Sequence, residues 1–267
     1  MTAVTHLAAP APRGDFRRAV RAEWTKFRTV RSSMWTLLVA SALTVGVGTA
    51  VLPLRSQDYH GPAARAAETA AYEGWWFEGQ NLGVLAVIIL GVLVATAEYS
   101  TGTMRATLAA VPSRGRVLAA KVTCLAAVTL AAGAVQAVAA FLIGRPVLAG
   151  RGIHVALTAP DALRGLAMAA LATAGAALFG LASGLIIRHT AGAIGGVVAV
   201  WFVLSALASL LPDSWSDLVR ALPAHANAGM FTPHAGMLAP GPATAVFAGY
   251  VTVLTAIAAV LFVRRDA

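Results

Sequence analysis

The stretch AEYSTGTMRATLAAVPSRGRVLAAK, residues 97–121, is a polar and basic segment between two long apolar runs. The apolar run before it, residues 79–97, carries no charged side chain, and Glu98 ends that run. Four cations follow before the next apolar run begins at residue 122: Arg105, Arg114, Arg116 and Lys121. A short charged segment between two such runs is typical of a loop that connects two membrane-spanning helices.

The composition of the whole chain agrees with a membrane protein. The chain is 58% hydrophobic and 12% charged, with a mean hydropathy of +0.75, whereas soluble domains are roughly 25% charged. The strict alternation of apolar and polar residues that marks a membrane β-barrel is absent. We therefore expect an all-α polytopic membrane protein.

Six apolar runs predict six transmembrane helices, because each is near or above the ~18–20 residues that cross a bilayer. They lie at about residues 35–52, 79–97, 122–144, 163–187, 191–211 and 242–263. Pro53 is expected to end the first span. Residues 1–14 are interpreted as a disordered tail and residues 264–267 as a short C-terminal tail.

Residues 15–34 have the pattern of an amphipathic helix lying in the headgroup region. One face carries Phe16, Val20, Trp24 and Phe27, and the opposite face carries arginines including Arg28. Glu23 and Arg31 project within the apolar arc, and a surface pair of Glu23 with Lys26 is worth only ~0.2–0.5 kcal/mol. Both a lipid anchor and a contact with a cytoplasmic partner fit this helix.

The distribution of positive charge predicts the orientation. Six spans place both termini on one side, and 14 of the 20 Lys and Arg residues then share that side. The positive-inside rule predicts that both termini and residues 98–121 lie on the cytoplasmic side of a bacterial cell membrane. The net charge of +9 is accounted for by anionic lipid, so no nucleic-acid partner is expected.

Small and polar residues within the spans indicate helix packing. Ala172, Ala176, Gly180 and Gly184 recur every four residues and predict a face that another helix approaches closely. Gln136 is expected to hydrogen-bond to a neighbouring helix, with a substrate contact as the alternative.

The chain carries no sign of its own catalysis or energy source. Neither G-x-x-x-x-G-K-[ST] nor H-E-x-x-H occurs in it. His225 and His234, with Asp213 and Asp217 upstream, are too loosely spaced to predict a metal site. We expect no enzyme activity, no metal and no cofactor bound by this chain.

Two stretches resemble the type-2 ABC exporter permeases of actinobacterial and related kinds. The run from Glu98 to Arg105, followed by Leu108, Pro112-Ser113-Arg114 and Lys121, is similar to the cytoplasmic loop of that family. Glu23-Trp24-Thr25-Lys26, with Arg28, Arg31-Ser32 and Trp35-Thr36-Leu37, is similar to its N-terminal elbow helix. The six-span layout is similar as well.

The resemblance implies a permease subunit that pairs with a second permease subunit, identical or different, and with separate ATP-binding subunits that hold ATP and Mg²⁺. Members of the family export drugs, antibiotics, lipids or peptides, and some confer antibiotic resistance. In the family a short coupling helix after the second span sits on the ATP-binding subunit. The residues implied for this role are Glu98, Gly102, Thr103, Met104, Arg105, Leu108, Val111 and Arg114.

The residues themselves support a contact at this loop. Met104, Leu108 and Val111 form one apolar stripe of about two helical turns, and Pro112 ends it. Glu98, Gly102 and Thr103 are expected to form the bend before it. The alternatives are a lipid-facing basic loop with no partner and, at the level of function, an ATP-independent channel or membrane anchor.

Overall fold

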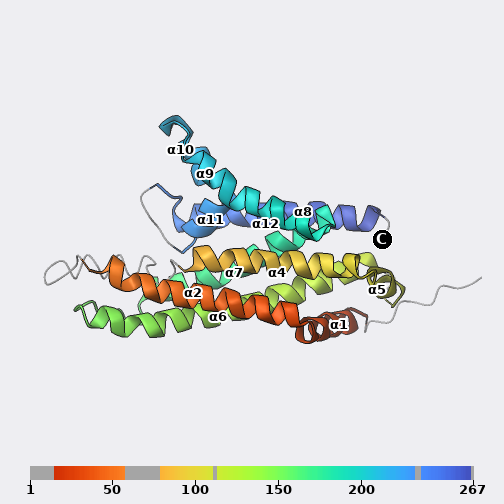
Figure 1. Cartoon of the computed structure of the whole chain (residues 1–267), viewed down its shortest axis with the longest axis horizontal. Coiled ribbons are helices and arrows are strands. Elements are labelled where there is room, and N and C mark those ends of the chain that lie inside the picture. The colour runs from red at the N-terminus through yellow and green to blue at the C-terminus, as the bar shows by residue number, and fades with distance from the viewer. Residues whose placement is uncertain (1–14, 58–78, 111–112, 232–235, 266–267) are drawn as a thin grey trace, which may run out of the picture.

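The computed structural model describes residues 15–57, 79–110, 113–231 and 236–265. Within these ranges the chain is helical and contains no β-strand (Figure 1). Six of the described helices are long and apolar enough to cross a membrane. The expected all-α, six-span membrane protein is therefore confirmed.

The six candidate spans form a helical bundle. They are α2 (Arg31–Arg55), α4 (Gln80–Ser100), α6 (Arg114–Ala149), α7 (Pro160–Ile187), the continuous helix α8–η3–α9 (Thr190–Ala208) and α12 (Pro240–Arg264). The amphipathic helix α1 (Asp15–Thr29) and the short helix α5 (Met104–Ala110) lie at one end of this bundle (Figure 1).

Two helix boundaries differ from the expectation. Helix α6 has 36 residues and begins at Arg114 instead of residue 122, so at 1.5 Å per residue it is ~54 Å long and extends beyond the hydrocarbon core. Pro53 does not end α2, which continues to Arg55. A proline in the last turn removes one backbone hydrogen bond, and the turn is closed by the Ser56 amide donating to the Leu52 carbonyl (3.0 Å).

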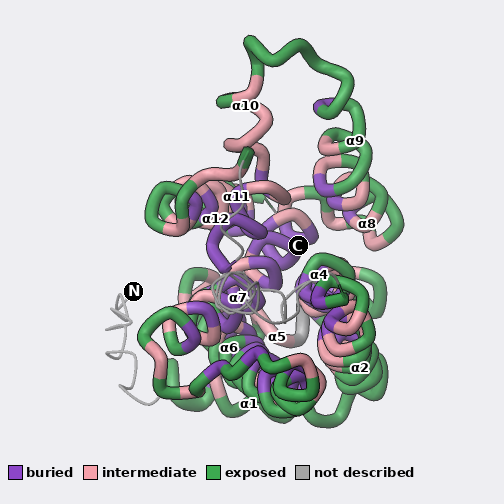
Figure 2. Tube along the Cα trace, turned by 90° about the vertical axis from the view of Figure 1, so that its left-hand side faces the viewer, coloured by how far each residue is buried: buried purple, intermediate pink, exposed green. Residues whose placement is uncertain are grey.

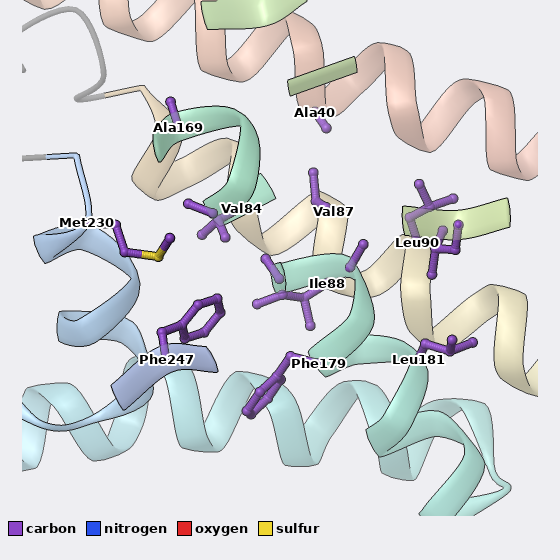
Figure 3. Packing of buried hydrophobic residues seen from close by; sticks show 14 of the residues in the cluster. Ala40, Val84, Val87, Ile88, Leu90, Ala169, Phe179, Leu181, Met230 and Phe247 are labelled. Carbon is purple, nitrogen blue, oxygen red and sulfur yellow. The ribbon is translucent and has the colours of Figure 1, made fainter. Parts of the chain in front are cut away.

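Helix α7 is the centre of the bundle and packs closely against α4. The residues Ala172, Ala176, Gly180 and Gly184 are all buried on α7. A Cβ on Gly180 would lie 2.0 Å from the Ile88 carbonyl oxygen, and a Cβ on Gly91 would lie 2.0 Å from the Ala177 carbonyl oxygen. Backbone therefore meets backbone here, which only glycine allows. Figure 3 shows Ile88 beside Phe179 and Leu181 in the surrounding core.

Polar side chains within the bundle join neighbouring helices. The Gln136 amide on α6 donates to the Ser41 hydroxyl on α2 at 2.8 Å. The Gln80 amide on α4 donates to the Thr173 hydroxyl on α7 at 2.6 Å. For Gln136 an interhelical hydrogen bond is thus present.

The fifth span contains a π-helical turn, η3 (Ala199–Val203), between α8 (Thr190–Val198) and α9 (Leu204–Ala208). Trp201 of this turn is buried between Phe179 and Phe247, with ring centroids 5.6 and 6.1 Å away in edge-to-face contacts. Beyond the turn, α9 and the following α10 (Ser216–Arg220) project from the bundle, as Figure 2 shows. The chain returns through α11 (Pro223–Gly229), where the Asn227 amide donates to the Ala172 carbonyl at 3.2 Å.

The C-terminal end of α12 lies at the same end of the bundle as α5 (Figure 1). The Arg114 guanidinium, at the start of α6, donates to the carbonyl oxygens of Phe262 and Val263 at 3.4 Å each. Arg265 donates to the Ile186 carbonyl at 3.2 Å. Arginines therefore connect the ends of α6, α7 and α12.

Candidate functional site

A tight bend separates α4 from α5 at the end of the bundle. Gly102 has a φ of 70°, in the left-handed region that favours glycine. The hydroxyls of Thr101 and Thr103 hydrogen-bond to each other at 2.9 Å across it. The bend includes Gly102 and Thr103 as expected, whereas Glu98 still belongs to the last turn of α4.

Next to this bend, two lysines and two glutamates from three helices form a closed set of ion pairs, which we call the charge cluster. Lys26 of α1 bonds to Glu23 Oε1 and to Glu98 Oε1, both at 2.8 Å. Lys121 of α6 bonds to Glu23 Oε2 at 2.9 Å and to Glu98 Oε1 at 2.8 Å. Each lysine therefore bridges the same two carboxylates, and the cluster joins α1, α4 and α6.

The charge cluster is largely withdrawn from solvent. The Lys121 side chain is only 2% exposed, while Lys26 at 38% is its most accessible member. Burying four ions is costly unless they compensate one another, and here two positive and two negative charges balance. Burial would lower the pKa of Lys26, but its hydrogen bonds to Glu23 and Glu98 outweigh burial and raise this pKa above the usual 10.5.

Helix α5 is attached to the cluster. Lys26 makes a third, longer hydrogen bond to the Thr107 hydroxyl of α5 at 3.4 Å. One oxygen of the cluster, Glu98 Oε2, is buried and has no hydrogen-bond partner among the described residues. Through Lys26 the cluster thus connects α5 to α1.

One expectation about these charges is wrong. Glu23 and Lys26 pair with each other, but as part of a buried network and not as a weak surface pair. Lys121, at the end of the basic segment 97–121, is buried between two carboxylates of its own chain. Glu98 is likewise buried. Helix periodicity could not reveal these pairs because it does not show which distant helix lies opposite.

The apolar stripe of α5 faces the chain's own core. Met104 is 2% exposed, and Leu108 is half-buried against the same core. Met104 therefore offers no open contact face, contrary to the expectation, and Leu108 offers only part of one. Contact of α5 with an ATP-binding subunit stays a prediction. Val111 and the side chain of Arg105 lie outside the described part of the structure. The exposed residues here are Ser100, Thr101, Gly102, Thr103 and Ala109.

Helix α1 presents its buried face to α6. Ala19, Glu23 and Phe27 are buried, whereas Phe16 and Trp24 are exposed and Val20 is half-buried. The expected apolar arc is therefore divided between a protein-facing side and an open side.

Arg31 was expected in the amphipathic helix but lies outside it. The extended backbone of Val30 (φ −80°, ψ 106°) ends α1, and Arg31 is the exposed first residue of α2. Arg28 stays on α1, but its guanidinium lies 6.0 Å from the Trp24 ring centroid. It therefore lies beside the apolar arc and not on the opposite face as expected.

Arg114 and Arg188 stabilise the same end of the bundle. Arg114 is half-buried and bonds to the end of α12, so it is directed toward its own chain. Arg188 ends α7 and lies over the Tyr99 ring of α4, 5.2 Å from its centroid. The family resemblance implied a partner contact for Arg114, while the structure gives it a contact between helices.

A cavity of about 410 Å³ lies beside the charge cluster, between α1, α2, α4 and α6. Phe27, Leu93, Val94 and Leu125 form apolar parts of its wall. The side chains of Glu23, Lys26, Glu98 and Lys121 all contribute to its lining.

A compositional signal for the cluster was present in the sequence. The chain has only two lysines among its 20 basic residues, and both take part in the cluster. A compact ammonium can donate to several carboxylates at once, whereas a planar guanidinium favours one in a bidentate arrangement. The two lysines, each close to an apolar span, could therefore have indicated the ion pairs from the sequence.

Comparison with known proteins adds no relative. The chain matches no protein-family model, and no curated protein matches it in sequence.

Proposed function

We propose that this chain is the membrane-spanning permease subunit of an ABC exporter, driven by a separate ATP-binding subunit that contacts the α5 end of the bundle. The resemblance of residues 98–121 and of the Glu23–Leu37 region to type-2 exporter permeases supports this proposal. The six spans and the terminal position of α1 and α5 are compatible with it.

One observation carries the proposal: α5 is a distinct helix held between the bundle core and the charge cluster. Met104 and Leu108 anchor it in the core, and Thr107 contacts Lys26. A force applied to α5 would therefore reach α1, α4 and α6 directly. A loop that only touches lipid has no need of such attachment, so the arrangement favours a mechanical input.

The excess of positive charge at this end supports a cytoplasmic position for α5 and for both termini. An ATP-binding subunit would approach from that side and meet the exposed turn at residues 100–103 and Ala109. The cargo classes that the resemblance suggests are drugs, antibiotics, lipids and peptides.

The test uses exposed positions, because a charge at buried Met104 would damage the fold. We expect Thr103→Glu and Ala109→Glu to abolish co-purification with an ATP-binding subunit encoded by a neighbouring gene. The yield of monodisperse permease should stay the same. The matched control is Ser214→Glu, at an exposed position just before α10, which Figure 1 shows away from α5. Complex formation that survives in both α5-end variants would contradict the proposal.

A further inference from the structure

A second hollow lies on the outside of the α1–α6 contact. It has a volume of about 440 Å³ and is lined by Val20 and Trp24 of α1 and by Thr123, Ala127, Val128 and Ala131 of α6. We call it the α1–α6 groove. Thr123, Ala127 and Ala131 are exposed and one helical turn apart, so small side chains leave an apolar channel along α6.

Three arginines lie on the same side of α1 as Trp24, which forms one wall of this groove. At 100° per residue, Arg17, Arg21 and Arg28 lie within about 60° of Trp24 around the helix. All three are exposed, and the Arg28 guanidinium lies 6.0 Å from the Trp24 ring centroid. The groove therefore has an apolar lining, and exposed arginines lie beside its Trp24 wall.

None of the carboxylates whose side chains the structure describes supplies the matching negative charge. Glu23 and Glu98 are buried in the charge cluster. Among the side chains that the structure describes, the exposed carboxylates are Asp161, Asp213 and Asp217. Asp161 lies in the first turn of α7, whose other end meets Tyr99 through Arg188. Asp213 precedes the projecting α10, and Asp217 lies within it. These three groups thus belong to the end opposite α1.

This separation argues against a second copy of the chain as the occupant. Two copies inserted in the same orientation would keep these exposed aspartates at the opposite membrane surface from the arginines of α1. An anionic lipid, in contrast, brings its phosphate to the headgroup level together with a chain that fits an apolar channel.

We propose that the α1–α6 groove binds an anionic phospholipid. One acyl chain lies along Thr123, Ala127 and Ala131 against Trp24, and the headgroup phosphate accepts hydrogen bonds from Arg17, Arg21 and Arg28. A lipid bound there would brace α1 against α6 from the outer side, opposite the charge cluster. This inference needs only the membrane location and is independent of the proposed transport function.

The test measures the fluorescence of Trp24 in the full chain, in nanodiscs that contain phospholipid with brominated acyl chains. The difference between the wild-type protein and Trp24→Phe isolates this one of the six tryptophans. We expect brominated phosphatidylglycerol to quench Trp24 more strongly than brominated phosphatidylcholine at equal mole fraction. Filling the channel with Ala127→Leu should reduce quenching by both lipids.

Arg21→Gln should lower the preference for phosphatidylglycerol about fivefold, because each basic residue near an anionic surface contributes about 1 kcal/mol. Arg18→Gln is the matched control: Arg18 is exposed on α1 but lies about 120° around the helix from Trp24. It should keep most of the preference. A control with 10 mM inorganic phosphate should leave the preference unchanged.

Several results would overturn the inference. Equal quenching of Trp24 by the two brominated lipids would mean that no anionic headgroup is selected. An equal effect of Arg18→Gln and Arg21→Gln would indicate only a diffuse attraction. Loss of the preference in inorganic phosphate would show a free-anion site, and absence of quenching by either lipid would show that protein covers the groove.

Discussion

At the scale of single residues, Lys121 has the most demanding environment in the described chain. Its ammonium is nearly inaccessible and bridges Glu23 of α1 and Glu98 of α4. Without it, two buried carboxylates would retain only Lys26, which is partly exposed. Removing one partner of a buried ion pair leaves an uncompensated charge and costs ~3–5 kcal/mol. Lys121 therefore holds the α5 end of the bundle together.

We predict that Lys121→Met destabilises the protein by about 3–5 kcal/mol, seen as a lower thermal unfolding midpoint in detergent. Methionine keeps the length of the side chain but removes its charge. Arg145→Met, at an exposed position on the same helix, is the control and should leave the midpoint almost unchanged.

Removing one negative charge as well should recover part of this loss. In the double variant Lys121→Met/Glu98→Gln, the remaining Glu23 and Lys26 balance each other. Its unfolding midpoint should lie above that of Lys121→Met alone. If the double variant is the less stable of the two, the charge balance is not what stabilises the cluster.

At the scale of helices, the contact between α4 and α7 depends on missing side chains. At both Gly91 and Gly180, an added Cβ atom would lie 2.0 Å from a backbone carbonyl oxygen of the other helix. Close approach of this kind brings van der Waals contacts and is a common basis for helix association in membranes.

Gly180→Ala should consequently destabilise the protein by about 1–3 kcal/mol, because the added methyl group forces α4 and α7 apart. Gly195→Ala, in α8, is the matched control, since a Cβ there meets nothing within 4 Å. The yield and unfolding midpoint of the two variants in detergent provide the measurement. Equal stability of both would show that α4 and α7 separate without cost.

At the scale of the whole molecule, the bundle has two chemically different ends. One end holds α1, α5, the charge cluster and the arginines that join α6, α7 and α12. The projecting α10 lies away from this end (Figure 1). The distribution of Lys and Arg favours the first end in the cytoplasm.

A labelling experiment checks this orientation. In a Cys124→Ala background, which removes the single cysteine, we expect Ser214→Cys to react with a membrane-impermeant maleimide in intact cells. Thr103→Cys should react only after permeabilisation. Both positions are exposed in the structure, so access to the reagent depends on the side of the membrane. The reverse pattern would place α5 outside and contradict the proposed function.

The sequence by itself determined the class of the protein, its six spans, the glycine bend at residue 102 and the small-residue positions on α7. These features are local: an apolar run of sufficient length is readable without knowing its neighbours, and so is a spacing of four residues.

Only the tertiary structure decided what Lys26, Glu98, Lys121 and Met104 contact. Lys26 meets a carboxylate 72 residues away, and Lys121 meets one 98 residues away. Charged and apolar side chains near a span end can turn outward or inward, and the choice depends on which helix packs opposite. That packing placed Lys121 in buried ion pairs and Arg114 in contact with the end of α12. Burial of Lys121 is tolerated because opposite charges meet there.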